Sequence, residues 1–291
     1  MPEDSRLPWT DEQWAMAQRI VQESARKARV ASSFLPLVGP LPDGQASVPA
    51  LEMTYQEINP PQPYEAAERL RVEASKTLPL TRIACNVYLK AQQVEDPELG
   101  AARQMLSRAA DVIGRLEDAI VFNGQPGEGQ PPPDIDGIPE IYTVRGGQKQ
   151  DGLLDGEDQV EVEAGSEALV NAIVDAVQKL ESRGHYGPFA CVLGSTLYNI
   201  ANTPSPGSLV LPSDRITPFL EGGPLRRSSV VPQDQGVLVA LAGSPIDLVV
   251  ASDVHVSYVQ LTLEPRYVLR VSERFVLRIK QADATYRLQA Q

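Results

Sequence analysis

The sequence predicts an α+β fold in which the main sheet is assembled from distant parts of the chain. Two amphipathic helices are expected in the first half, and the chain becomes rich in β-prone residues after Gly236. The gaps between the late strands are too short for helical crossovers, which favours antiparallel pairing. Helices and strands therefore form separate groups, as in the α+β class. The predicted late strands cover residues 237–241, 246–250, 255–262, 267–271 and 275–279.

The first helix is expected over residues 10–30. Thr10 and Gln13 form a capping box, in which each side chain accepts a hydrogen bond from the other residue's backbone amide. Trp14 and Val21 then fall on one apolar face. The basic residues lie mostly off that face. Docking on the protein body is therefore preferred to a role as a nucleic-acid-binding arm.

A two-stranded excursion is expected over residues 50–90, before the second helix. Its β-prone segments, 51–55 and 78–88, flank a polar, proline-rich middle at 59–63. A long isolated hairpin is only marginally stable in water. It should therefore need a partner, and another subunit can supply one.

The second helix is the longest, over residues 97–122, and Asn123-Gly124 ends it. At 1.5 Å per residue it would span roughly 39 Å, enough to form the backbone of a domain. Its apolar face comprises Ala102, Met105, Leu106, Ala109, Ile113, Leu116 and Ile120.

The middle of the chain is expected to be mixed α/β. A Gly/Pro-rich linker at 124–133 lacks the Lys-Ser/Thr of a phosphate-binding loop. The acidic segment 151–167 does not match the spacing of a calcium loop, which favours a solvated loop. Ser166 is expected to cap a helix that Gly184 ends, followed by a buried strand at 189–193.

The composition indicates an acidic protein of 291 residues, with 38 Asp and Glu against 26 Lys and Arg and a net charge of −12. Such a chain is a poor general polyanion binder, so no nucleic-acid partner is expected. Two cysteines and two histidines are too few and too dispersed for a zinc, iron–sulfur or haem site, so no metal and no cofactor is expected. The lack of a basic, apolar leader and of an apolar run of about 20 residues predicts a cytoplasmic protein without a membrane segment.

No candidate catalytic group has an obvious partner in the sequence. Glu117 and Asp118 are adjacent, so on a helix they diverge by about 100°, which favours salt bridging or subunit contact over a carboxylate dyad. Cys191 lies within a strand, where a thiol packs as a small hydrophobe, although His185 is near in sequence. Ser195 is expected to cap a short helix, and its segment lacks the second glycine of a nucleophile elbow. We therefore predict no catalytic residue.

Short motifs occur in order along nearly the whole chain. They are Gln13-Trp14, Phe34 to Gly39-Pro40, Leu78-Pro79-Leu80, Leu116 to Gly124, Gly137-Ile138, Gly187 to Leu193, Gly222-Gly223, Asp253 with Tyr258, and Glu273 to Ile279. In this order they resemble the encapsulins, also called linocin or bacteriocin-type proteins, whose subunits have the phage capsid fold of Hong Kong 97 type. The resemblance implies a hollow icosahedral shell that encloses a cargo enzyme through a short C-terminal targeting peptide of that cargo. It implies no enzymatic activity in the shell itself.

The resemblance also implies a division of the chain. Residues 1–49 would form the N-terminal helix and the start of the P-domain, 50–90 the E-loop that lies across a neighbouring subunit, and 91–124 the long P-domain helix. Residues 125–225 would form the A-domain at the symmetry axes, and 226–291 the P-domain sheet.

By the same resemblance, the N-terminal helix faces the lumen and shares a cargo-peptide groove with the P-domain sheet. Burying a few apolar side chains there would contribute about 1.5–3 kcal/mol each, and many sites on one shell would add avidity. The matching groove positions are Val21, Ala25, Val256, Leu269 and Val271. The residues expected near the five-fold pore are Thr203, Pro204, Ser205, Pro206 and Gly207.

Two departures limit what the resemblance carries over. Some members have a flavin-stacking tryptophan where this chain has Gln92, so flavin binding is not carried over. Some have a phenylalanine where this chain has Ala25, so its cargo tail is expected to carry a larger anchor or to bind more weakly. The implied partners are further copies of the chain and a ferritin-like protein, a dye-decolourising peroxidase or a hemerythrin-like protein as cargo, and no residue chooses among these cargoes.

Two alternatives stay open from the sequence. A phage or prophage major capsid protein would package DNA on the same fold, and a standalone hydrolase would use Ser195 or Cys191. The helix containing Trp14 and the lack of a long scaffolding segment favour the encapsulin interpretation.

Overall fold

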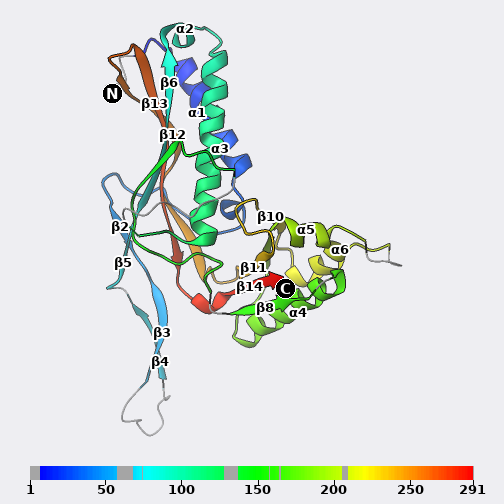
Figure 1. Cartoon of the computed structure of the whole chain (residues 1–291). Coiled ribbons are helices and arrows are strands. Elements are labelled where there is room, and N and C mark those ends of the chain that lie inside the picture. Colours follow the sequence, from blue (N-terminus) through cyan, green and yellow to red (C-terminus); the bar gives the residue numbers. More distant parts are fainter. Residues whose placement is uncertain are drawn as a thin grey trace.

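Two mixed five-stranded sheets, a long helix and a projecting hairpin organise the chain (Figure 1). The computed structural model describes residues 7–57, 68–73, 75–127, 137–156, 158–163, 165–204 and 209–290. Its helices are α1 (Asp11–Ala28), α2 (Ala91–Val94), α3 (Gly100–Asn123), α4 (Ser166–Ser182), α5 (Ser195–Ala201) and α6 (Pro212–Ile216), with short 3-10 turns η1 (Ala31–Ser33), η2 (Thr217–Leu220) and η3 (Ala282–Ala284). Its strands are β1 (Leu37–Val38), β2 (Ser47–Pro49), β3 (Glu52–Glu57), β4 (Glu68–Glu73), β5 (Thr77–Pro79), β6 (Thr81–Lys90), β7 (Tyr142–Gly146), β8 (Gln159–Val162), β9 (Phe189–Leu193), β10 (Leu225–Arg227), β11 (Gln235–Ala240), β12 (Ile246–Leu261), β13 (Arg266–Ile279) and β14 (Thr285–Ala290).

The first sheet has the strand order β1-β12-β13-β6-β7, and α1 and α3 cover one of its faces. Buried and exposed side chains alternate along β6, and this pattern shows which face of the sheet lies against the helices. Ile83, Val87 and Leu89 are buried in the main core, whereas Arg82 and Tyr88, which alternate with them, are exposed on the opposite face. The period of two therefore gives this sheet a helix-covered face and an outer face.

The second sheet has the order β10-β9-β11-β14-β8, with α4 packed against it. Its strand β9 is buried at every position, as expected for residues 189–193. The prediction that 226–291 forms one sheet is wrong, because β11 and β14 pair with each other in this second sheet. The strand β7, from the predicted A-domain range, instead joins the first sheet beside β6.

The predicted late strands also merge. Residues 246–250 and 255–262 belong to the single long strand β12, and 267–271 and 275–279 belong to β13. Irregular register near Ser252 in β12 supplies the break that the sequence suggested. β-Bulges bend a strand without ending it, so the apolar pattern is interrupted while the strand continues.

The hairpin β3–β4 projects away from the body of the molecule (Figure 1). Its root, the pair β2–β5, packs on the outer face of the first sheet in a small separate core of Val48, Ala50, Leu78, Leu80, Val249, Ala251 and Val276. Farther out, Leu70 and Val72 are 63% and 47% exposed. The expected two-stranded excursion is therefore present and displays apolar side chains; its proline-rich middle, residues 59–63, lies outside the described residues.

Several local predictions change at helix ends. Helix α3 begins at Gly100, not Pro97, because the Asp96 carboxylate accepts the backbone N–H groups of Glu98 and Gly100 and Leu99 turns left-handed. In α3, Met105 is 37% exposed and lies at the edge of the buried face.

Two serines predicted as helix caps are instead first helical residues. Ser166 and Ser195 follow the N-caps Gly165 and Gly194, and neither helix has a side-chain cap bond. The apolar stretch of residues 34–38 forms a strand only at Leu37–Val38, because Phe34 follows the turn η1.

Candidate functional site

Helix α1 is fixed against α3 and the first sheet along its whole length. The capping box of Thr10 and Gln13 is present, as predicted. The indole of Trp9 donates to the carbonyl of Val94 at 3.1 Å and meets Trp14 edge-on, with ring centroids 5.1 Å apart. Both tryptophans of the chain thus lie where α1 begins, so their fluorescence should depend on the position of this helix.

The two helices approach each other closely at Gly114 of α3. A Cβ atom at this position would lie 3.0 Å from the carbonyl oxygen of Ala25 and from Cβ of Ala28. Glycine here costs helix propensity relative to alanine, and the backbone of α1 occupies the space that a side chain would take. The site therefore depends on a contact between helix backbones.

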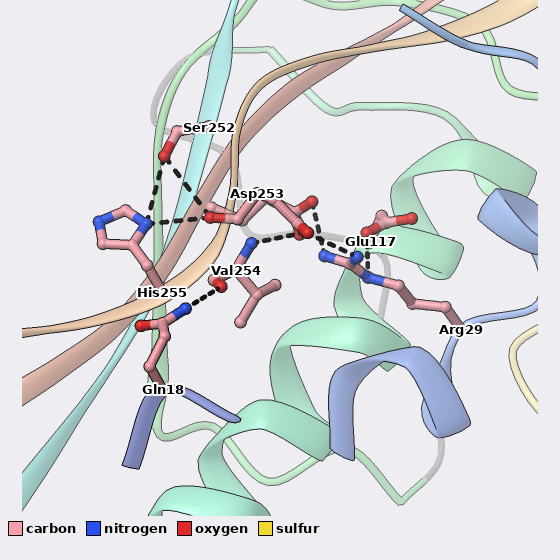
Figure 2. Close-up of polar contacts among 8 residues, drawn as sticks. Gln18, Arg29, Glu117, Ser252, Asp253, Val254 and His255 are labelled. Carbon is pink, nitrogen blue, oxygen red and sulfur yellow. Dashed lines mark hydrogen bonds and ion pairs between the residues drawn. The ribbon is translucent and has the colours of Figure 1, made fainter. Parts of the chain in front are cut away.

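On its other side, α1 contacts the backbone of β12 through Gln18 (Figure 2). The Gln18 side chain donates to the carbonyl of Val254 at 3.0 Å, as Figure 2 shows. Its amide oxygen accepts the N–H of Val256 at 3.0 Å. The side-chain amide of Gln18 thus bonds two backbone groups of β12 where the register of this strand with β13 is irregular, as a neighbouring strand would do. Buried backbone groups need such partners, because leaving them unpaired is costly.

A buried ion cluster joins the C-terminal end of α1 to three other elements. The Arg29 guanidinium lies 2.6 Å from Glu117 of α3, 2.6 Å from Glu273 of β13 and 3.0 Å from Asp253 of β12. Figure 2 shows Arg29 between Glu117 and Asp253. Next to it, the Asp118 carboxylate accepts the backbone N–H groups of Val30 and Ala31 at 2.7 and 2.8 Å. The salt-bridging role expected for Glu117 is confirmed.

This cluster holds more negative than positive charge in a buried place. Burial raises the pKa of Glu117, which Arg29 partly offsets. Burial and the neighbouring Glu117 raise the pKa values of Asp118 and Glu273 well above their usual range. Burial opposes the charge of Arg29, but Glu117 and Glu273 outweigh it and raise its pKa. A single guanidinium therefore compensates two fully buried glutamates, a balance that favours retention of a proton between them.

An open groove of about 670 Å³ runs beside this cluster, between α1 and the strand β1, and we call it the α1–β1 groove. Its β1 side presents Leu37 and Val38, which are 57% and 37% exposed, with Pro40 beyond them. Its α1 side is polar and charged. The lining residues are Arg19, Gln22, Glu23, Arg26, Arg29, Ser32, Leu37, Val38, Gly39, Pro40, Glu117, Val250 and Asp253.

The five positions predicted for the cargo groove lie underneath α1, not on its open side. Val21, Ala25, Leu269 and Val271 are completely enclosed, and Val256 is 9% exposed. They form the contact between helix and sheet that the protein itself fills. In this structure α1 covers these side chains, and the adjacent open surface is the α1–β1 groove.

Sequence reasoning did not single out Arg29, Glu273 or Leu37 for this site. A signal was available for Glu273, because the period of two places it on the same buried face as Val271 and Phe275. A charged residue at such a position requires a buried counter-charge. No comparable signal marks Leu37, because a two-residue strand has no readable period.

The candidate nucleophiles are not brought together. Cys191 is fully buried, and burial raises the pKa of its thiol to about 12, so it is protonated at neutral pH. Cys85 is also buried, with its pKa raised by burial to about 11. His185 contacts the carboxylate of Asp283 at 3.0 Å. Among the described residues, no group of three or more His, Cys, Asp or Glu could hold a metal ion.

The predicted pore loop is only partly described. Thr203 donates its hydroxyl to the carbonyl of Asn199 at 2.7 Å, at the end of α5, and both Thr203 and Pro204 are exposed. Ser205, Pro206 and Gly207 lie outside the described residues. In the helices that the structure describes, none is long and apolar enough to cross a membrane.

Comparison with solved structures defines the class of fold. A virus-like particle from Pyrococcus furiosus has a TM-score of 0.70 with this chain at 16% identity, covering 96% of this chain and 100% of the other. The capsid of Myoviridae phage XM1 gives 0.59 at 14% identity, covering 88% and 90%. The fold is that of Hong Kong 97-type capsid subunits, as predicted.

Comparison of sequences narrows the class. A linocin family model, described as "Encapsulating protein for peroxidase", matches residues 3–138 and 141–276. The type 1 encapsulin shell protein EncA of Myxococcus xanthus is 25% identical over 288 residues, which cover 95% of this chain and 92% of that protein. The chain belongs to the encapsulin shell-protein family, and its function is that of a structural shell subunit.

Proposed function

We propose that this chain assembles into a hollow icosahedral shell in the cytoplasm and encloses a guest enzyme, while carrying out no catalysis itself. Membership of the encapsulin family supports the shell. The buried, protonated thiol of Cys191 supports assigning the chemistry to the guest. The family description names a peroxidase, which favours a redox enzyme as guest, such as a dye-decolourising peroxidase, over a ferritin-like or hemerythrin-like protein.

The guest is held by a short apolar tail at its C-terminus, and the α1–β1 groove is the site that receives it. The observation that carries this assignment is the exposure of Leu37 and Val38 next to a charged wall. An extended tail can place apolar side chains against β1 and polar groups against Arg26 or Asp253. Covering one large aliphatic side chain would contribute about 1.5–3 kcal/mol.

The shell is tested by expressing the chain alone. We expect elution as megadalton particles in size exclusion and hollow spheres in negative-stain images. A monomer would contradict shell formation and favour the hydrolase alternative. Nuclease-resistant nucleic acid inside the particles would favour the phage capsid alternative.

The groove is tested with Val38→Asp. Its matched control is Met105→Asp, because Met105 has the same exposed fraction, 37%, but lies on α3 outside the groove. A fluorescent protein is fused to C-terminal tails of proteins encoded by neighbouring genes, and its co-purification with shells is measured. We expect Val38→Asp to lose the guest and Met105→Asp to retain it. Equal loading by both variants would contradict the assignment.

A further inference from the structure

Arginines surround two small residues on the outer face of the first sheet. Val271 and Phe275 of β13 belong to the core under the helices, so the residues that alternate with them point to the outer face. Directly opposed residues of antiparallel strands share a face. Three successive pairs of β13 and β6 therefore lie together there: Arg274 with Arg82, Ser272 with Ala84, and Arg270 with Asn86. We call these six residues the arginine frame, and its small middle pair forms the floor.

The frame holds positive charge without a matching negative charge. Arg145 of β7 lies directly opposite Arg82 and adds a fourth arginine at the edge. Burial lowers the pKa of Arg82, and the neighbouring Arg270, Arg274 and Arg145 lower it further. Within the described part of the chain, no carboxylate forms an ion pair with any of the four. Four like charges are thus held together in a chain whose net charge is −12.

The arginines of the frame keep hydrogen-bond donors for a ligand. Arg270 donates to the Asn86 side chain at 2.9 Å, and Arg274 donates to the carbonyl of Gln45 at 2.6 Å. Both acceptors are neutral, so these bonds position the guanidinium groups without cancelling their charge. A guanidinium has five N–H donors, so each of these arginines has others left. The frame is therefore positioned and still able to bind an anion.

The floor of the frame contains an unpaired hydroxyl. Ser272 is 1% exposed, and its Oγ has no hydrogen-bond partner among the residues that the structure describes. Across the strands it faces Ala84 and His255, and the Nδ1 of His255 already contacts the carbonyl of Asp253 at 3.0 Å (Figure 2). Buried polar groups are nearly always paired, because leaving one unpaired is costly. An anion held by the flanking arginines would give this hydroxyl an acceptor.

The arrangement of the donors selects the class of anion. Arg270 and Arg274 are four residues apart, or roughly 13 Å along the strand, a gap that two arginine side chains can close from its ends. A phosphate group carries a charge of about −1.5 to −2 at pH 7. Its oxygens point in several directions from one centre, so they can meet donors from three sides and from the floor. Guanidinium groups also match phosphate oxygens in geometry, through paired N–H donors.

We propose that the arginine frame is a binding site for a phosphate group, either free or carried by a small molecule. Arg82, Arg270 and Arg274 pair with its oxygens, and the hydroxyl of Ser272 donates to one of them after the arginine side chains beside it change rotamer. The bound anion relieves the repulsion among the arginines. Binding therefore stabilises the folded chain. The site needs neither the shell nor the guest, so this inference stands apart from the proposed function.

The first test measures phosphate binding to the full chain by isothermal titration, with sodium chloride at equal ionic strength as the blank. We expect Arg82→Gln to weaken phosphate binding at least about tenfold, because it removes charge-assisted hydrogen bonds. Arg226→Gln, which removes an exposed arginine from β10 of the second sheet, should bind like the wild-type chain. A wild-type chain that does not bind phosphate, or an equal loss in both variants, would overturn the inference.

A second variant separates binding from folding. The hydroxyl of Ser272 has no partner among the described residues, so Ser272→Ala should leave the melting temperature in the absence of phosphate unchanged or higher. The same variant should bind phosphate more weakly, because one donor to the anion is gone. Wild-type phosphate affinity in Ser272→Ala would overturn the inference.

The third test locates the bound group and its source. Phenylglyoxal modifies accessible arginines, and mass spectrometry of peptides gives the rate at each one. Saturating phosphate should slow the modification of Arg82 and leave that of Arg226 unchanged. Protection by phenyl phosphate as well as by inorganic phosphate would support a site for phosphorylated molecules, and protection by inorganic phosphate alone would support a site for the free ion. An unchanged rate at Arg82 with both compounds would overturn the inference.

Discussion

Replacing Glu273 with glutamine should make the subunit less sensitive to alkali. Glu273 is fully buried against Arg29 and Glu117, and burial, followed by the charge of Glu117, raises its pKa well above its usual value of 4.5. The folded chain therefore keeps a proton that the unfolded chain releases. The contribution of Glu273 to folding stability is then greatest below pH 4.5, falls as the pH rises from 4.5 to the folded pKa, and is constant above it.

The magnitude follows from the proton count. One proton held only by the folded state corresponds to a slope of about 1.4 kcal/mol per pH unit. For a domain of this size, that difference shifts the melting temperature by roughly 3–5 °C. Glutamine has nearly the same shape as the protonated glutamic acid and cannot ionise, so Glu273→Gln removes the slope and keeps the packing.

The assay is thermal unfolding of the wild-type protein and of Glu273→Gln between pH 4 and pH 9, plotted as the difference in melting temperature. We expect a difference near zero at pH 4 that grows in favour of the variant as the pH rises. Glu98→Gln, which removes an exposed carboxylate just before α3, should give a flat difference. A flat difference for Glu273→Gln, or one that favours the wild-type protein at high pH, would refute the reasoning.

The remaining predictions concern the contacts that hold α1 against α3 and the first sheet. Arg29→Met should destabilise the subunit by about 3–5 kcal/mol in urea unfolding at pH 7, because it leaves buried carboxylates unpaired; recovery at pH 4 is expected, and an equal loss there would contradict the cause. Gln18→Ala should cost about 1–3 kcal/mol and speed hydrogen exchange at the Val256 amide, which loses its acceptor; Glu23→Ala, on the exposed side of α1, is the control. Gly114→Val should cost about 1–3 kcal/mol and shift tryptophan fluorescence, because the added side chain displaces α1; an unchanged spectrum would contradict that displacement.

Local features that depend on neighbouring residues could be predicted from the sequence. The capping box at Thr10 and the buried strand at 189–193 appear as expected, because each is defined by a short pattern of side chains. Helix geometry argued against a carboxylate dyad at Glu117 and Asp118, and Glu117 has one of the two roles that remained, a salt bridge. Ser166 and Ser195 were misassigned because a glycine just before each can end the extended segment without any side-chain bond.

Pairing over long distances could not be predicted. Strands β11 and β12 are both strongly apolar and only a few residues apart, yet they belong to different sheets. Burial pattern tells which side chains point inward, but it does not specify which core receives them. Burial separates two kinds of apolar position in the same way: Val21 and Leu269 lie in the contact between α1 and the sheet, whereas Leu37 stays exposed beside α1.

The position of β14 has a consequence for how shells are made in the cell. This strand lies between β11 and β8, inside the second sheet, although it is among the last segments of the sequence. The second sheet cannot close until β14 has been synthesised and has left the ribosome. A nascent chain that has not yet reached β14 therefore carries an unfinished sheet and cannot supply a complete subunit for the shell.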